Sequence, residues 1–210
     1  FYARELAAGE STQQIEKAVP YYAEFFREFP HSRYAAQVAI VALPALEKIG
    51  QLEAGVKQLE DVVRHSCQSG EEAGLQRAAK GLVWKMLALG DQQSQLHQRW
   101  KAEGSTTFSI VMRHSLSAVY AAGIKQSQVT WGRKLRYTAL RDIAYAELLT
   151  ESDGAAMPAY VRADLGWWLL ENGNFPERAS VLFRSAQKSS IWRNNQRAMM
   201  GEAAAMRLVN

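Results

Sequence analysis

Histidine and cysteine are the side chains in this sequence best suited to metal binding or nucleophilic catalysis. The chain holds four histidines and one cysteine: His31, His65, His97, His114 and Cys67. No two histidines have the H-x-x-x-H or H-E-x-x-H spacing that places two ligands on one helix face. Cys67 lies in a Ser/Gln/Gly segment, where we favour an inert or buried thiol over a nucleophile. We therefore predict no metal site and no cofactor, with the histidines as surface or helix-end residues.

Sequence motifs for other common chemistries are also absent. The chain has no Gly-rich phosphate loop, no G-x-S-x-G nucleophile elbow and no dinucleotide-binding fingerprint. Carboxylates are plentiful, but the pair Glu60-Asp61 is typical of the charged surface of a helix. We predict that the protein is not an enzyme. An active site assembled from residues distant in sequence remains the alternative.

Composition and charge indicate one helical unit of moderate size. The 210 residues are 48% hydrophobic, with a net charge of +4 and a pI near 9.2. No run of apolar residues approaches the roughly 20 that a membrane-spanning helix needs. Nucleic-acid binders usually carry a denser basic stripe, so that class of partner ranks last. The chain begins with Phe1 rather than Met, so we expect a mature or trimmed product.

Residues 163–186 are the most informative stretch and indicate two short helices folded against each other. The Asn-Gly-Asn segment at 172–174 is expected to end the first helix as a left-handed C-cap. Pro176 is suited to the first turn of the second helix, where its missing N–H would have no partner. Gly166 on the first helix would allow close approach of the two backbones. The second helix carries a stripe of small, large and small residues: Ala179, Phe183 and Ala186.

This hairpin resembles the tetratricopeptide repeat (TPR), a helix–turn–helix unit of about 34 residues. The resemblance lies in L-G-x-x-L, a turn glycine and A-x-x-x-F-x-x-A, although the turn is one residue longer than usual. Equivalent positions recur irregularly along the chain: Ala18, Gly55, Leu96, Ile143 and Ala179. The resemblance implies an all-α, right-handed α-solenoid of degenerate TPR-like repeats. We expect about ten or eleven helices in a single domain over 1–210, which could be a fragment of a longer chain.

The remaining helices follow from apolar periodicity and from glycine and proline positions. We predict helices over 32–48, 52–65, 71–89, 105–122, 132–150 and 192–208. A shorter helix is marked by Leu96 and Trp100, and four glycines are expected to end helices: Gly50, Gly90, Gly104 and Gly123. The helix over 132–150 carries a predicted apolar stripe of Leu135, Ala139, Ile143 and Ala146. The last helix would cap the array or continue into a further unit.

A second resemblance concerns the junction at 25–39, which reads FFREFPHSRYAAQVA. It is similar to the F-x-x-x-[FY]-P-x-S-x-Y-A junctions of TPR-like proteins in the bacterial envelope. Pro30 would end one helix and Ser32 would cap the next. The resemblance implies a periplasmic or envelope-associated protein, with the cytoplasm as the alternative.

The TPR resemblance also implies candidate partner-binding residues. In TPR-like hairpins the first helix of each pair lines the concave groove, and the matching positions here are Tyr160, Ala163, Trp167, Leu170 and Glu171. Trp167 and Trp168 are about 100° apart on the helix and cannot share one environment. We expect Trp167 to face the groove as a peptide anchor and Trp168 to be packed. The alternative is that both are buried between repeats.

Four basic residues near the start of one predicted helix form a second candidate site: Arg133, Lys134, Arg136 and Arg141. Cations at a helix start oppose the helix dipole, and such a local conflict can mark a site for an acidic partner. The alternative is a solvated face neutralised by nearby acids.

These observations favour a non-catalytic scaffold that binds a peptide or protein partner in a concave groove. One alternative is the superhelical scaffold domain of a larger enzyme, such as a lytic transglycosylase. The other is a helical repeat that binds nucleic acid, whose affinity would fall steeply with salt. No membrane span is expected, and the sequence does not indicate an oligomeric state.

Overall fold

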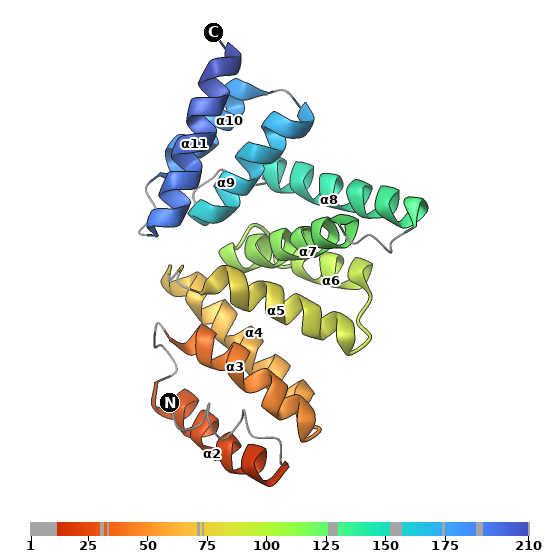
Figure 1. The fold of residues 1–210 in the computed structure, drawn as a ribbon, viewed down its shortest axis with the longest axis vertical. Coiled ribbons are helices and arrows are strands. Elements are labelled where there is room, and N and C mark those ends of the chain that lie inside the picture. Colours follow the sequence, from red (N-terminus) through yellow and green to blue (C-terminus); the bar gives the residue numbers. More distant parts are fainter. Residues whose placement is uncertain are drawn as a thin grey trace. The chain divides into compact units, whose positions relative to one another are not determined.

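The computed structural model describes residues 12–29, 32, 34–70, 72, 74–125, 130–151, 157–173, 175–187 and 191–209. Over these residues every regular element is helical: ten α-helices, α2 to α11, and one π-helical segment, η1. Figure 1 follows these helices along the chain. The predicted all-α class and helix number are thereby confirmed for the described part of the chain.

The chain divides into two compact units, at residues 1–98 and 99–210. The first unit contains α2 (Thr12–Glu28), α3 (Ala35–Lys48), α4 (Leu52–Ser69) and α5 (Leu75–Ala88). Each of these helices packs against the next along the chain, as the lower part of Figure 1 shows. Gly50 ends the α3 region with φ of +73°, a conformation that glycine adopts without steric cost. The predicted break at Gly50 is therefore confirmed.

Small residues allow the helices of the first unit to approach closely. Gly55 of α4 is one, because a Cβ at this position would lie 2.7 Å from Cδ1 of Leu46 on α3. Ala18 of α2 is fully buried. Ser32 is not the N-cap of α3 as predicted, because that position is Tyr34, which has no side-chain cap hydrogen bond. The Ser32 Oγ instead accepts a hydrogen bond from the Tyr34 backbone N–H at 3.2 Å, in the turn before the helix. Pro30 lies outside the described residues.

The helix α6 (Gln93–Lys101) spans the boundary, and the second unit continues with α7 (Thr107–Lys125) and α8 (Trp131–Glu151). The middle of α7 is buried on all sides, including its polar residues Ser109, Arg113, His114, Ser115 and Ser117. The helix continues past Gly123 to Lys125, so the predicted C-cap at Gly123 is wrong.

The predicted hairpin is present as α9 (Ala159–Trp168), η1 (Leu169–Gly173) and α10 (Pro176–Ala186). The second helix begins at Pro176, as predicted. The first helix does not end at 172–174 as an α-helix, because α9 is followed by the π-helical turn η1. After this turn, the backbone N–H of Phe175 donates a hydrogen bond to the Leu169 carbonyl at 3.3 Å. A wider turn accommodates an additional residue within a helix. The π-helical turn thus lengthens the connection between α9 and α10.

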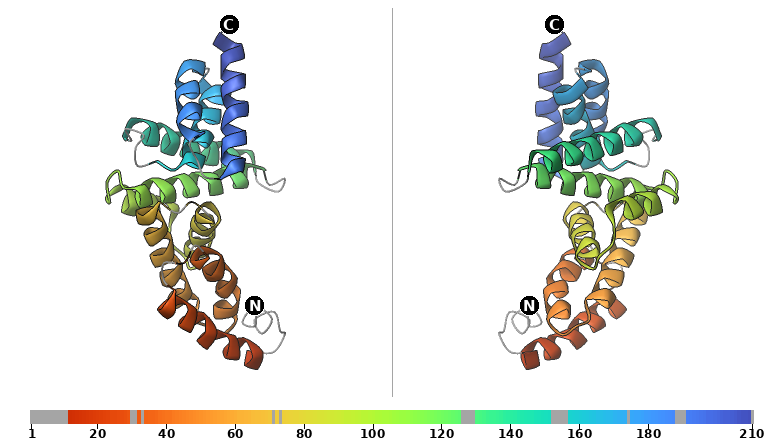
Figure 2. Two further views of the ribbon diagram at one scale, coloured as in Figure 1. Left: turned by 90° about the vertical axis from the view of Figure 1, so that its left-hand side faces the viewer. Right: turned by 90° about the vertical axis from the view of Figure 1, so that its right-hand side faces the viewer.

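A third helix, α11 (Trp192–Val209), completes a layer with α9 and α10. The two side views of Figure 2 agree that α10 and α11 lie side by side. The predicted stripe of α10 forms the core of this layer, because its three members are fully buried: Ala179, Phe183 and Ala186. The Phe183 ring lies against Gly166 of α9, where a Cβ would be 2.7 Å from Cε1 of the ring.

The helix α8 exposes the face that was predicted to be apolar and packed. Leu135 and Ile143 are 57% and 55% exposed, and Ala139 and Ala146 are exposed as well. The buried face instead carries Ala144, Tyr145 and Leu148. The prediction is wrong because α8 packs against α7 through this second set, in which the Tyr145 ring stacks on His114 at a centroid distance of 5.7 Å.

Candidate partner-binding site

A depression of about 420 Å³ lies on the face that α9 and η1 share with α11. It is lined by Trp167, Glu171, Arg193, Gln196, Arg197 and Met200. Gln196 and Arg197 of α11 are each three or four positions from both Arg193 and Met200, so the four residues lie on one face of that helix. Apolar surface, two arginines and one carboxylate thus meet in one groove.

Trp167 joins this groove to the core of the second unit. Its ring meets Phe183 edge to face at a centroid distance of 5.6 Å, and the side chain is half-buried. Leu170 packs against the same core cluster instead of lining the groove. Because the core holds the Trp167 ring, the ring would lose little conformational entropy on contacting a ligand.

Trp168 lies on a different side of α9, where it contacts α8. Its Nε1–H donates a hydrogen bond to Oδ1 of Asp142 at 2.9 Å. Its ring meets Tyr145 edge to face at 5.8 Å. The two adjacent tryptophans therefore have different surroundings, as helix geometry requires.

Tyr160 does not lie on an accessible surface. It is only 3% exposed, and its ring meets His114 edge to face at 5.6 Å. Its predicted role as a groove residue is corrected accordingly, because a partner cannot reach the side chain without opening the core. Ala163 is buried in the same way. Of the residues predicted on this helix, the structure brings only Trp167 and Glu171 to the depression.

The basic residues of α8 lie apart from the groove residues. Arg133 and Arg136 are exposed and Lys134 is half-buried. Arg141 is bound to its neighbour Asp142, with Nη2 2.7 Å from Oδ1. Arg141 is therefore neutralised locally, as the alternative interpretation of this cluster expected. The other three have no carboxylate within ion-pair distance in the described part of the chain.

The sequence analysis did not anticipate a set of polar contacts that links α7, α9 and α11 beside the groove. Nε2 of His114 on α7 lies 3.0 Å from Oδ2 of Asp164 on α9, and Arg197 forms an ion pair with Oδ1 of the same carboxylate. The expectation of a surface or helix-end position is wrong for His114, which is fully buried. Asp164 thus holds Arg197 at the edge of the groove.

Tyr145 also belongs to the surroundings of these polar contacts. Burial raises the pKa of its hydroxyl, and the nearby charge of Asp164 raises it further. The Tyr145 phenol therefore stays protonated at neutral pH. The aspartate was hard to recognise in the sequence, because it lies 50 positions from His114 and in no motif.

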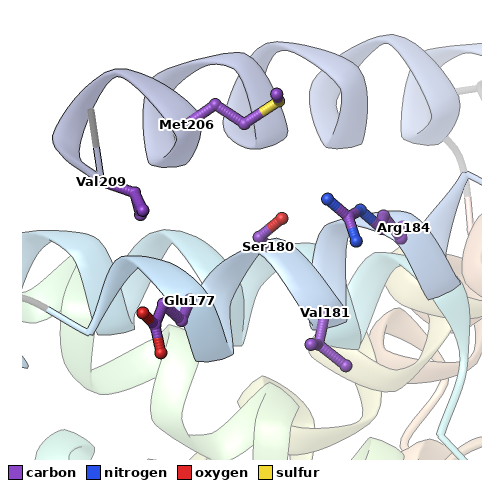
Figure 3. A pocket seen from close by; sticks show the side chains of 6 residues that line it. All are labelled: Glu177, Ser180, Val181, Arg184, Met206 and Val209. Atoms are coloured by element: carbon purple, nitrogen blue, oxygen red, sulfur yellow. The ribbon is translucent and has the colours of Figure 1, made fainter.

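A second depression of about 310 Å³ lies between α10 and α11. Figure 3 shows its six lining side chains, of which Met206 and Val209 come from α11. The other four come from α10: Glu177, Ser180, Val181 and Arg184. This depression has no half-buried aromatic ring in its lining, so we consider it the weaker candidate.

Comparison with models of protein families, with curated proteins and with solved structures gave no match for this chain. The described residues contain no group of three or more His, Cys, Asp or Glu side chains able to hold a metal ion. Within the same residues, no helix has both the length and the apolar content needed to cross a bilayer.

Proposed function

We propose that this protein is a non-catalytic scaffold that binds a peptide segment of a partner protein in the groove between α9 and α11. The observation that carries the proposal is the position of Trp167. Its ring is held by Phe183 on one side and borders an open groove on the other. Pre-positioned aromatic side chains of this kind are frequent binding hot spots.

The groove residues suggest the chemistry of the peptide. Met200 is 69% exposed and offers a flexible apolar surface beside Trp167. Arg193 has no carboxylate within ion-pair distance in the described residues. Arg197 already forms an ion pair with Asp164. A peptide that places a large apolar side chain beside Trp167 and a carboxylate near Arg193 would suit this surface.

We further propose that the helices form a degenerate TPR-like α-solenoid and that the protein acts in the bacterial envelope. The hairpin of α9 and α10, with its buried Ala179 and Phe183, supports the repeat assignment. The junction motif before α3 supports the location through its resemblance to envelope proteins.

Selection from a displayed library of random peptides would test the groove. The wild-type protein would serve as bait, with counter-selection on the Trp167→Ala variant. Enriched peptides should pair an aromatic or aliphatic residue with an acidic one. In a titration with such a peptide, Trp167→Ala should weaken binding by roughly 30-fold, as expected for a hot spot.

Matched variants distinguish the groove from a general effect of mutation. Arg193→Gln should weaken binding by about tenfold and reduce its salt dependence. Val181→Ala, an exposed position on α10 that lines the other depression, should leave affinity unchanged. Equal affinity of wild type and Trp167→Ala for all enriched peptides would contradict the proposal.

A further inference from the structure

The exposed face of α8 is an apolar feature that the groove leaves unexplained. Trp131 is 78% exposed, the highest value among the large hydrophobic residues described. Leu135 and Ile143 continue from it at spacings of four and eight residues. At about 100° per residue, the stripe from Trp131 through Leu135 to Ile143 covers roughly 120° of the helix surface. Exposed Ala139 and Ala146 lie within it, and so does the carboxylate of Asp142, which is bound by Arg141 and Trp168.

Cations border this stripe. By the same helix geometry, Lys134 lies beyond one edge of the stripe and Arg136 beyond the other, with Arg133 further round the helix. The carboxylates of α8 with described side chains do not balance them. Asp142 is bound by Arg141 and Trp168, and Glu147 is bound by Lys101 at 2.9 Å. The free charge beside the stripe is therefore positive.

We propose that the exposed face of α8 binds the surface of an anionic lipid bilayer, with the helix lying in the plane of the membrane. Apolar residues on one side and Lys or Arg at the border are the features that hold an amphipathic helix in the interfacial layer. Tryptophan at the edge of the stripe suits the same layer, since its ring is apolar and its N–H is polar. The charge complement is the anionic lipid headgroup.

A lipid surface fits this face better than a protein helix does. The stripe lies on one convex helix, whereas amphipathic protein helices bind in grooves between elements. The two depressions described above lie on α9 and α11 and on α10 and α11, away from this stripe. A bilayer needs no preformed groove, because lipids can rearrange around Trp131 and Leu135. The inference does not depend on the peptide groove.

Co-sedimentation of the full chain with vesicles tests this proposal. Vesicles of phosphatidylglycerol mixed with phosphatidylcholine should bind the wild-type protein, and vesicles of phosphatidylcholine alone should bind it much less. The double variant Trp131→Gln with Leu135→Gln should lower the partition coefficient by roughly tenfold or more. Neutralising Arg133, Lys134 and Arg136 to Gln should lower it on the order of a hundredfold.

Two controls isolate the face of α8. Trp84→Gln removes a tryptophan on α5 that is 47% exposed, and Trp167→Ala removes the groove anchor. Both variants should retain vesicle binding. Helicity and melting temperature are measured for every variant to confirm that it is folded. Loss of binding in Trp84→Gln to the same extent as in the α8 variants would overturn the proposal. So would failure of wild type to bind the anionic vesicles.

A third result would identify a different occupant. The wild-type protein could fail to bind the vesicles but bind poly-glutamate, with that binding lost in the α8 variants. In that case the face binds an acidic protein and the lipid proposal is wrong. Retention of vesicle binding by Trp167→Ala, together with its loss of peptide affinity, would separate this surface from the groove.

Discussion

The ring of Phe183 on α10 occupies the space that a side chain at Gly201 on α11 would fill. A Cβ at Gly201 would overlap the ring, and a Cβ at Gly166 on α9 would lie 2.7 Å from its Cε1. Both glycines are buried, and the ring is fully buried between them. The three-helix layer of α9, α10 and α11 therefore depends on two positions that lack a side chain.

Gly201→Ala should destabilise the protein by about 1–3 kcal/mol, because the buried ring has no free space into which to move. Gly81→Ala on α5 is the matched control, since nothing lies within 4 Å of a Cβ there. It should stabilise by about 0.5–1 kcal/mol through helix propensity. Chemical denaturation would measure both. Equal effects of the two changes would contradict the close packing at Phe183.

The adjacent tryptophans should respond differently to replacement by phenylalanine. Trp168→Phe removes the hydrogen bond to Asp142, whereas Nε1 of Trp167 is buried without an acceptor in the described part of the chain. Both variants replace an indole with the smaller phenyl ring, so the loss of packing is similar in both. Trp168→Phe should therefore cost about 1 kcal/mol more stability than Trp167→Phe. The opposite order in urea denaturation would contradict the assigned surroundings.

Glu202 should make the packing of α10 against α11 sensitive to acid. Its Oε1 accepts a hydrogen bond from Nε of Arg184 at 2.6 Å and its Oε2 accepts one from Gln187, and these bonds lower the pKa of Glu202. A lowered folded-state pKa stabilises the protein above the unfolded pKa of about 4.3. This contribution is lost as pH falls through the folded value.

The measurement is the melting temperature of wild type and Glu202→Gln across pH. The variant should melt slightly lower at pH 7, and the difference should shrink below about pH 4. Glu16→Gln, at an exposed position on α2, is the control and should show no such difference. A difference for Glu202→Gln that stays constant down to pH 2 would show that the carboxylate charge is not responsible.

The single cysteine should be nearly inert in the folded protein. Burial raises the pKa of the Cys67 thiol to about 12, while the charge of Arg64 opposes this shift. At pH 8 its thiolate fraction should be on the order of a thousandfold below that of an unfolded chain. Alkylation followed by mass spectrometry should be correspondingly slow until denaturant is added. Rapid labelling of the native protein would mean that the α4 region opens.

The hairpin could be predicted from sequence because its signals are local. Gly166, Pro176, Ala179 and Phe183 lie within one short segment, and each has a conformational or packing role that its residue type makes recognisable. The π-helical turn could not be predicted, since it depends on the hydrogen bonds formed around Leu169.

The errors concern features that tertiary contacts decide. The helix α8 has two apolar faces, and the more continuous one through Leu135 and Ile143 is exposed. Its neighbour α7 selects the other face through Tyr145 and His114. The contact of His114 with Asp164 likewise joins separate helices, so no spacing rule within one helix could reveal it.

The central claim is that a partner peptide binds beside Trp167, and photo-crosslinking would test it most directly. Benzoylphenylalanine would replace Gln196 in the groove or Val181 in the other depression, with the selected peptide added. We predict crosslinking from the Gln196 position, abolished by Trp167→Ala, and little from Val181. Crosslinking from Val181 but not from Gln196 would contradict the proposed site.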